Sequence, residues 1–95
     1  MIVGHLQLTL RLDGCFSLKD KRRVLKSLMD RVRRCYQVSI AETDDCDLWN
    51  SAVVGVAYVS NDAGHVESVL TKVATAFDLC PEVSVEGAER AIERR

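Results

Sequence analysis

The first dozen residues alternate between apolar and mostly polar side chains with a strict period of two, and this pattern restricts the segment to one structure. An alternation of this kind is typical of a β-strand with one buried face. The buried face needs a covering layer, so the rest of the chain must supply helices or a second sheet. The apolar positions, which share their parity with Gly4, are Ile2, Leu6, Leu8, Leu10 and Leu12.

The segments that follow predict two covering helices. Ser17 with Asp20 three positions later has the pattern of a helix N-cap, and apolar residues then recur at helical spacing as far as Tyr36. A second amphipathic helix is predicted from about Val66 to Phe77, between the cap cluster at 60–62 and Pro81. Strands are predicted over residues 37–42, 48–60 and 83–85.

The resulting order, β-α-β-β-α-β, predicts a ferredoxin-like α+β sandwich. Its four-stranded antiparallel sheet would have the strand order 4-1-3-2, with both helices on one face. We expect one domain over residues 1–86, followed by a polar C-terminal tail over residues 87–95. The fold hosts many unrelated functions and therefore does not decide the activity.

Charge is distributed unevenly along the chain. The net charge is −1, but residues 19–34 hold eight basic and two acidic residues and carry +6, against −7 for the rest. Helical geometry gathers most of these cations on the side opposite the apolar stripe. Cations in the first turn of a helix are disfavoured by the positive end of the helix dipole. An anion bound at that end would offset this cost, so the pattern favours contact with RNA phosphates. The predicted nucleic-acid-binding residues are Lys19, Lys21, Arg22, Arg23, Lys26, Arg33 and Arg34.

Lys21 falls within the apolar arc, and we expect it to hold one phosphate together with the helix N-terminus. Two other interpretations of the charged helix remain open. The acidic segment Glu42–Asp47 would lie at the same end of the fold, so its carboxylates could pair with Lys19, Lys21 and Arg22. The helix face could also simply be solvated.

The uncovered face of the sheet is a second candidate surface. An apolar patch there would indicate a partner, and two such faces packed together would give a homodimer with twofold symmetry. An alternative function is therefore a dimeric protein-interaction module that binds no nucleic acid. The predicted interface residues are Val3, Trp49, Val53, Ala57 and Val59.

Several classes of function are disfavoured. The longest apolar run, residues 52–59, is far shorter than the roughly 20 residues of a membrane span, and the N-terminus lacks the pattern of a signal peptide. None of the four cysteines forms a C-x-x-C pair, so we expect reduced thiols, a cytoplasmic protein, no metal and no cofactor. We expect no enzyme activity; a third alternative is an enzyme acting on a small phosphorylated substrate near Lys21.

Three strings carry a family resemblance: SLKDKRRVLKSL at 17–28, VSIAE at 38–42 and VSND at 59–62. With residues 1–4 and 47–49, they resemble the small bacterial family of domain of unknown function 503, the YlxP-like proteins, over about residues 1–85. The resemblance implies a ferredoxin-like fold. It also implies a gene that often adjoins genes for translation initiation and ribosome maturation, notably ribosome-binding factor A. It brings no reaction and no catalytic residues, but it makes ribosomal RNA or a ribosome-assembly protein the expected partner.

Overall fold

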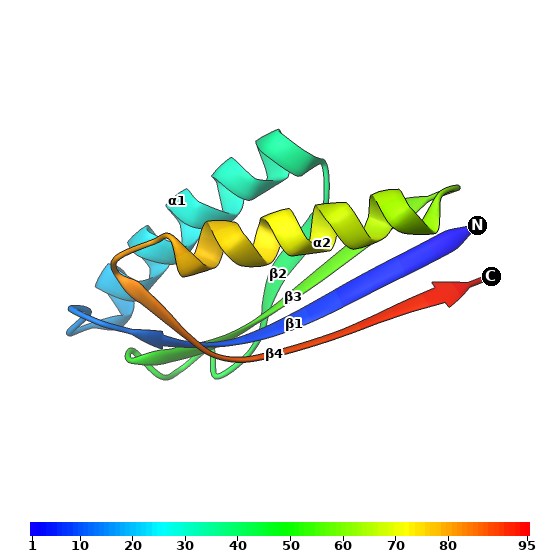
Figure 1. Cartoon of the computed structure of the whole chain (residues 1–95). Helices are drawn as coiled ribbons and strands as arrows, with labels where there is room; N and C mark the ends of the chain where they lie inside the picture. Colours follow the sequence, from blue (N-terminus) through cyan, green and yellow to red (C-terminus); the bar gives the residue numbers. More distant parts are fainter.

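Six elements follow one another in the computed structural model, which describes residues 1–95. The β-α-β-β-α-β order predicted from the sequence is confirmed (Figure 1). The elements are β1 (Ile2–Leu12), α1 (Leu18–Tyr36), β2 (Ser39–Asp44), β3 (Ser51–Ser60), α2 (Ala63–Asp78) and β4 (Val83–Arg94).

The four strands form one antiparallel sheet in the order β2-β3-β1-β4, as predicted. Both helices lie on the same face of this sheet and leave the other face uncovered (Figure 1). In the central pair, Val3 lies opposite Val59 and Thr9 lies opposite Val53. None of the helices combines the length and the apolar composition that crossing a bilayer requires.

The core lies between the sheet and the two helices, because the apolar parity of β1 faces the apolar stripes of α1 and α2. Gly4 occupies this parity for a steric reason. A Cβ atom at Gly4 would lie 2.3 Å from Val66 Cγ1 and 3.0 Å from Leu70 Cδ1, closer than packed carbon atoms approach. The glycine therefore lets α2 lie directly on β1.

Side-chain caps fix where both helices begin, as their sequences predict. The Ser17 hydroxyl accepts a hydrogen bond from the Asp20 amide, and the Asp62 carboxylate accepts one from the His65 amide. In turn, the Asp20 carboxylate accepts a hydrogen bond from the amide of Phe16, on the other side of the cap. These bonds orient the first turn of α1 and the loop before it.

The prediction of a polar tail over residues 87–95 is wrong. Residues 83–94 form the edge strand β4, which pairs with β1 along its whole length. Arg90 donates to Glu67 and Thr71 of α2 and thereby ties this strand to the helix layer. At the end of the pairing, Met1 and Arg95 exchange backbone hydrogen bonds. Ladder pairing and side-chain hydrogen bonds therefore hold a strand that has few apolar residues.

Candidate nucleic-acid interface

The outer side of α1 carries six cations, which we call the ridge. The apolar stripe of α1 packs on the sheet, so helical geometry turns these side chains toward solvent. All six ridge residues are exposed, and together they are Lys19, Arg22, Arg23, Lys26, Arg33 and Arg34. The structure thus brings together six of the seven predicted nucleic-acid-binding residues.

Lys21, the seventh, is not part of this surface, and the expectation that it holds a phosphate has to be corrected. Its side chain is 1% exposed. Its ammonium donates to the backbone carbonyls of Asp45 at 2.7 Å and Ser51 at 2.8 Å, and to that of Leu48. Glu42 Oε2 lies 2.7 Å from the same nitrogen and balances its charge. Since three carbonyls use its three N–H groups, Lys21 has none left for a ligand.

The acidic segment at residues 42–47 therefore neutralises one cation and leaves the ridge free. Glu42 pairs with Lys21, as the interpretation of internal pairing expected. No carboxylate lies within 4 Å of Lys19 or Arg22, the other two first-turn cations in that interpretation. One helix, α1, therefore carries both the buried ion pair of Lys21 with Glu42 and the exposed ridge.

Two aspartates interrupt the positive charge of α1. Asp30 lies within the ridge, 3.1 Å from Lys26 Nζ and 2.8 Å from Arg33 Nη1. The hydrogen bond from Lys26, together with the charges of Lys26 and Arg33, lowers the pKa of the Asp30 carboxyl. The second aspartate, Asp20, lies 3.7 Å from Arg23. Asp30 is therefore ionised at neutral pH and partly screens the ridge.

Arg33 also links the ridge to the sheet. Its second terminal nitrogen donates to the Ile40 carbonyl of β2 at 2.8 Å. Ser27, Asp30, Arg33 and Arg34 line a shallow, open hollow on the outer side of α1. The cations of this hollow come from a helix that is fixed to the sheet, so a ligand would meet them in a defined arrangement.

The structure places four of the five predicted interface residues on the uncovered sheet face. Val3 and Val53 are half-buried, Ala57 is exposed and Val59 is 55% exposed. Trp49 is not on this face, because β3 starts only at Ser51 and Trp49 lies in the loop before it. The pairing register puts Glu89 and Glu93 of β4 on the same face as Val3, and Glu86, the extra residue of a β-bulge, accepts a hydrogen bond from Arg11 of that face.

Sequence reasoning missed two features of the molecule. Arg31 is a further exposed cation of α1 that turns away from the ridge; with Lys72 of α2 it lines an interhelical groove of about 420 Å³. Phe16 and Trp49, from two different loops, stack with ring centroids 6.4 Å apart. Helical angles computed for Arg31 could have assigned it to the groove, but no local pattern predicts the aromatic pair.

The histidines and cysteines form no recognisable reactive group. His65 Nε2 lies 3.0 Å from the Tyr58 hydroxyl, and His5 projects from the uncovered sheet face. All four cysteines are unpaired, and burial raises the pKa of the Cys15 thiol. A thiol with a raised pKa is mostly protonated at neutral pH and is a poor nucleophile.

Comparison with known proteins places this arrangement in a family. The family model described as "Protein of unknown function (DUF503)" matches residues 3–90. The chain belongs to the DUF503 family. The DUF503 chain is also 38% identical over 78 residues to "Uncharacterized protein YlxP" of Bacillus subtilis (strain 168), covering 82% of this chain and 79% of that protein.

A solved structure supports the fold of this DUF503 protein. A de novo designed protein with ferredoxin fold, determined by solution NMR, aligns with a TM-score of 0.58 and 11% sequence identity. The alignment covers 100% of this chain and 88% of the designed one. At this identity the similarity shows the ferredoxin-like fold alone, and function has to be argued from the surface of the DUF503 chain itself.

Proposed function

We propose that this DUF503 protein is a non-enzymatic, cytoplasmic binding module whose ridge contacts the phosphates of structured RNA. One observation carries the proposal: six exposed cations lie on one rigid helix, while the acidic segment that could have neutralised them pairs only with buried Lys21. Neutralising phosphates releases counterions from the RNA and so favours binding. The gene neighbourhood implied by the family resemblance favours ribosomal RNA or a ribosome-assembly intermediate as the partner.

The charge distribution also supports one orientation on the RNA. On the uncovered sheet face Glu86 pairs with Arg11 and Glu93 pairs with Arg95, whereas Glu89 is unpaired and would repel phosphates. The ridge of α1 lies on the opposite side and attracts them. A helix of 19 residues is about 28 Å long, enough to follow several phosphates of one strand. The ridge holds no aromatic side chain for base stacking, so RNA shape would determine specificity.

A salt series on the wild type and on Asp30→Asn tests this proposal. The logarithm of the affinity for a structured RNA should fall linearly with the logarithm of the salt concentration, with a slope of about −4 to −5 for six contacts. Asp30→Asn removes the one carboxylate inside the ridge and should raise the affinity roughly threefold. The control Glu89→Gln removes one negative charge from the uncovered face and should leave the affinity nearly unchanged. A slope near zero would rule out binding through phosphates.

A second candidate function is homodimerisation through the uncovered sheet face. The observation that favours it is the exposure of Val59 and Ala57, and the partial exposure of Val53, on a face that no other element covers. Sedimentation of the wild type should then give a dimer, and Val53→Asp should give a folded monomer. Thr9→Asp, on the cross-strand neighbour of Val53, should act in the same way. A wild type that sediments as a monomer at high concentration would end this proposal. Dimerisation would leave both ridges exposed, because they lie on the opposite side of the sheet.

A further inference from the structure

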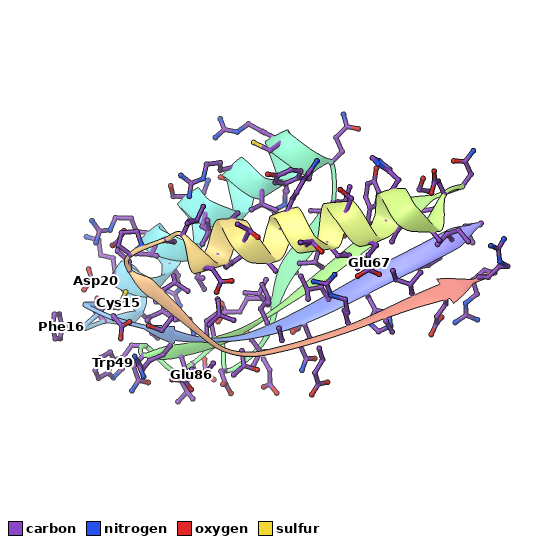
Figure 2. The ribbon with its side chains drawn as sticks, viewed as in Figure 1. Cys15, Phe16, Asp20, Trp49, Glu67 and Glu86 are labelled. Atoms are coloured by element: carbon purple, nitrogen blue, oxygen red, sulfur yellow. The ribbon has the colours of Figure 1, made fainter.

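Three large apolar side chains are exposed together at the end of the molecule opposite the chain termini, and we call them the aromatic tip. They are Phe16 (80% exposed), Leu48 and Trp49 (44% exposed). Figure 2 shows Phe16 and Trp49 projecting from this end, beyond the sheet and α1. The two rings stack at 6.4 Å with 30° between their planes. A ring as exposed as that of Phe16 is a poor contributor to the core and a good candidate for contact with a partner.

The fold holds the aromatic tip in place from two sides. Phe16 belongs to the loop between β1 and α1, and its amide donates to the Asp20 carboxylate at 3.2 Å. Leu48 and Trp49 belong to the loop between β2 and β3, where the buried ammonium of Lys21 binds the Leu48 carbonyl. A further bond from the Leu48 amide to the Asp45 carbonyl closes this loop into a turn. Both rings are thus presented by anchored backbone, which lowers the entropy cost of binding.

On the Trp49 side of the aromatic tip the charge is negative, whereas the first turn of α1 places the exposed ridge cation Lys19 three residues after Phe16. Asp45 and Asp47 belong to the same connection as Trp49, and Asp44 ends β2 just before it. No Lys or Arg nitrogen lies within 4 Å of these three carboxylates. Arg11, the one arginine of β1, pairs with Asp13 and Glu86. Aromatic faces attract cations, most strongly the face of tryptophan, and neighbouring carboxylates strengthen that attraction.

We propose that the aromatic tip binds an extended protein segment rich in arginine or lysine. A cationic side chain of that segment lies on the Phe16–Trp49 pair, and adjacent cations meet Asp44 and Asp47. The surface is built from two loops and not from α1, and its aspartates attract cations and not phosphates, so this inference goes beyond RNA binding and does not depend on it. The same three aspartates oppose two other occupants, a second copy of the tip and the phosphates of a single-stranded RNA.

Trp49 is the single tryptophan of the chain, so its fluorescence reports directly on the tip. Titration of the full chain with a short peptide of alternating arginine and glycine should change the Trp49 emission saturably. Rising salt should weaken this binding, because carboxylates contribute to it. Phe16→Ala should weaken the peptide affinity about threefold, because it removes one ring of the cation–π interaction. Asp44→Asn combined with Asp47→Asn should weaken it about fivefold.

Matched controls separate the aromatic tip from general surface effects. Leu79→Ala removes another exposed apolar side chain, 77% exposed at the end of α2, and Glu89→Gln removes an unpaired surface carboxylate. Both should leave the peptide affinity unchanged, and circular dichroism should show that Phe16→Ala is folded. An emission that the peptide does not alter, or equal reductions of affinity in the variants and controls, would overturn the proposal. So would a single-stranded RNA that quenches Trp49 in a Phe16-dependent way, since it would assign the tip to base stacking.

Discussion

Lys21→Met should lower the free energy of unfolding by about 3–5 kcal/mol, the cost of removing one partner from a buried ion pair. Methionine fills the space of the lysine stem but provides neither charge nor donors. The variant leaves the buried Oε2 of Glu42 without its cation and the carbonyls of Asp45 and Ser51 without their donor. Urea denaturation of the two proteins measures the difference.

Two companion variants show whether the buried position causes this destabilisation. Arg22→Met makes the same chemical change at the next residue, which is exposed, and should alter the free energy of unfolding by less than about 0.5 kcal/mol. Glu42→Gln keeps the three carbonyl contacts of Lys21 and should cost less than Lys21→Met. Equal stabilities of Lys21→Met and Arg22→Met would contradict the role assigned to Lys21.

Reversing three charges of the ridge, with Arg23, Lys26 and Arg34 each changed to Glu, should lower the affinity for structured RNA by about 100-fold or more at low salt. Each substitution removes one phosphate contact and adds a repulsion. The salt dependence should flatten as well, by about one slope unit for each phosphate that no longer meets a cation. All three side chains are exposed, so the fold should be preserved. A filter-binding or anisotropy titration across the salt series measures both effects.

A second triple variant distinguishes the effect of the ridge on RNA affinity from the effect of net charge. Changing Lys72, Arg94 and Arg95 to Glu produces the same change in net charge on α2 and at the end of β4. If the ridge is the contact surface, this control should weaken binding only a few-fold through the long-range field. Equal effects of the two triple variants would mean that overall charge, and not α1, governs the association.

Most of the fold could be predicted because its signals are local. The alternation in β1, the Ser17 cap and the apolar spacing of α1 and α2 each lie within one element, and together they determine the strand order. The second half of β4 could not be predicted in this way. Residues 87–95 consist mostly of Ala, Glu and Arg, a composition that is not typical of strands, and pairing with distant β1 stabilises them. Charged side chains on this edge also hinder pairing with another sheet.

In the candidate site, too, the features that arise within one helix could be predicted, and those that arise from contacts between distant segments could not. The ridge follows from helical angles, so the amino-acid sequence is sufficient to place its six residues on one side of α1. The role of Lys21 depends on carbonyl groups 24 to 30 residues further along the chain. The aromatic tip likewise joins Phe16 to Trp49 across the fold. Such long-range contacts leave no periodic trace in the sequence.

Lys21 also stabilises the conformation of the loop between β2 and β3, whatever the ionic composition of the solution. Four oxygens converge on its ammonium, an environment that resembles the coordination shell of a bound cation. Here the central cation is covalently attached to the neighbouring helix and cannot dissociate. The loop conformation therefore needs no dissolved ion at any particular concentration. It depends instead on the folded state of α1, so the loop and the helix should order together when the chain folds.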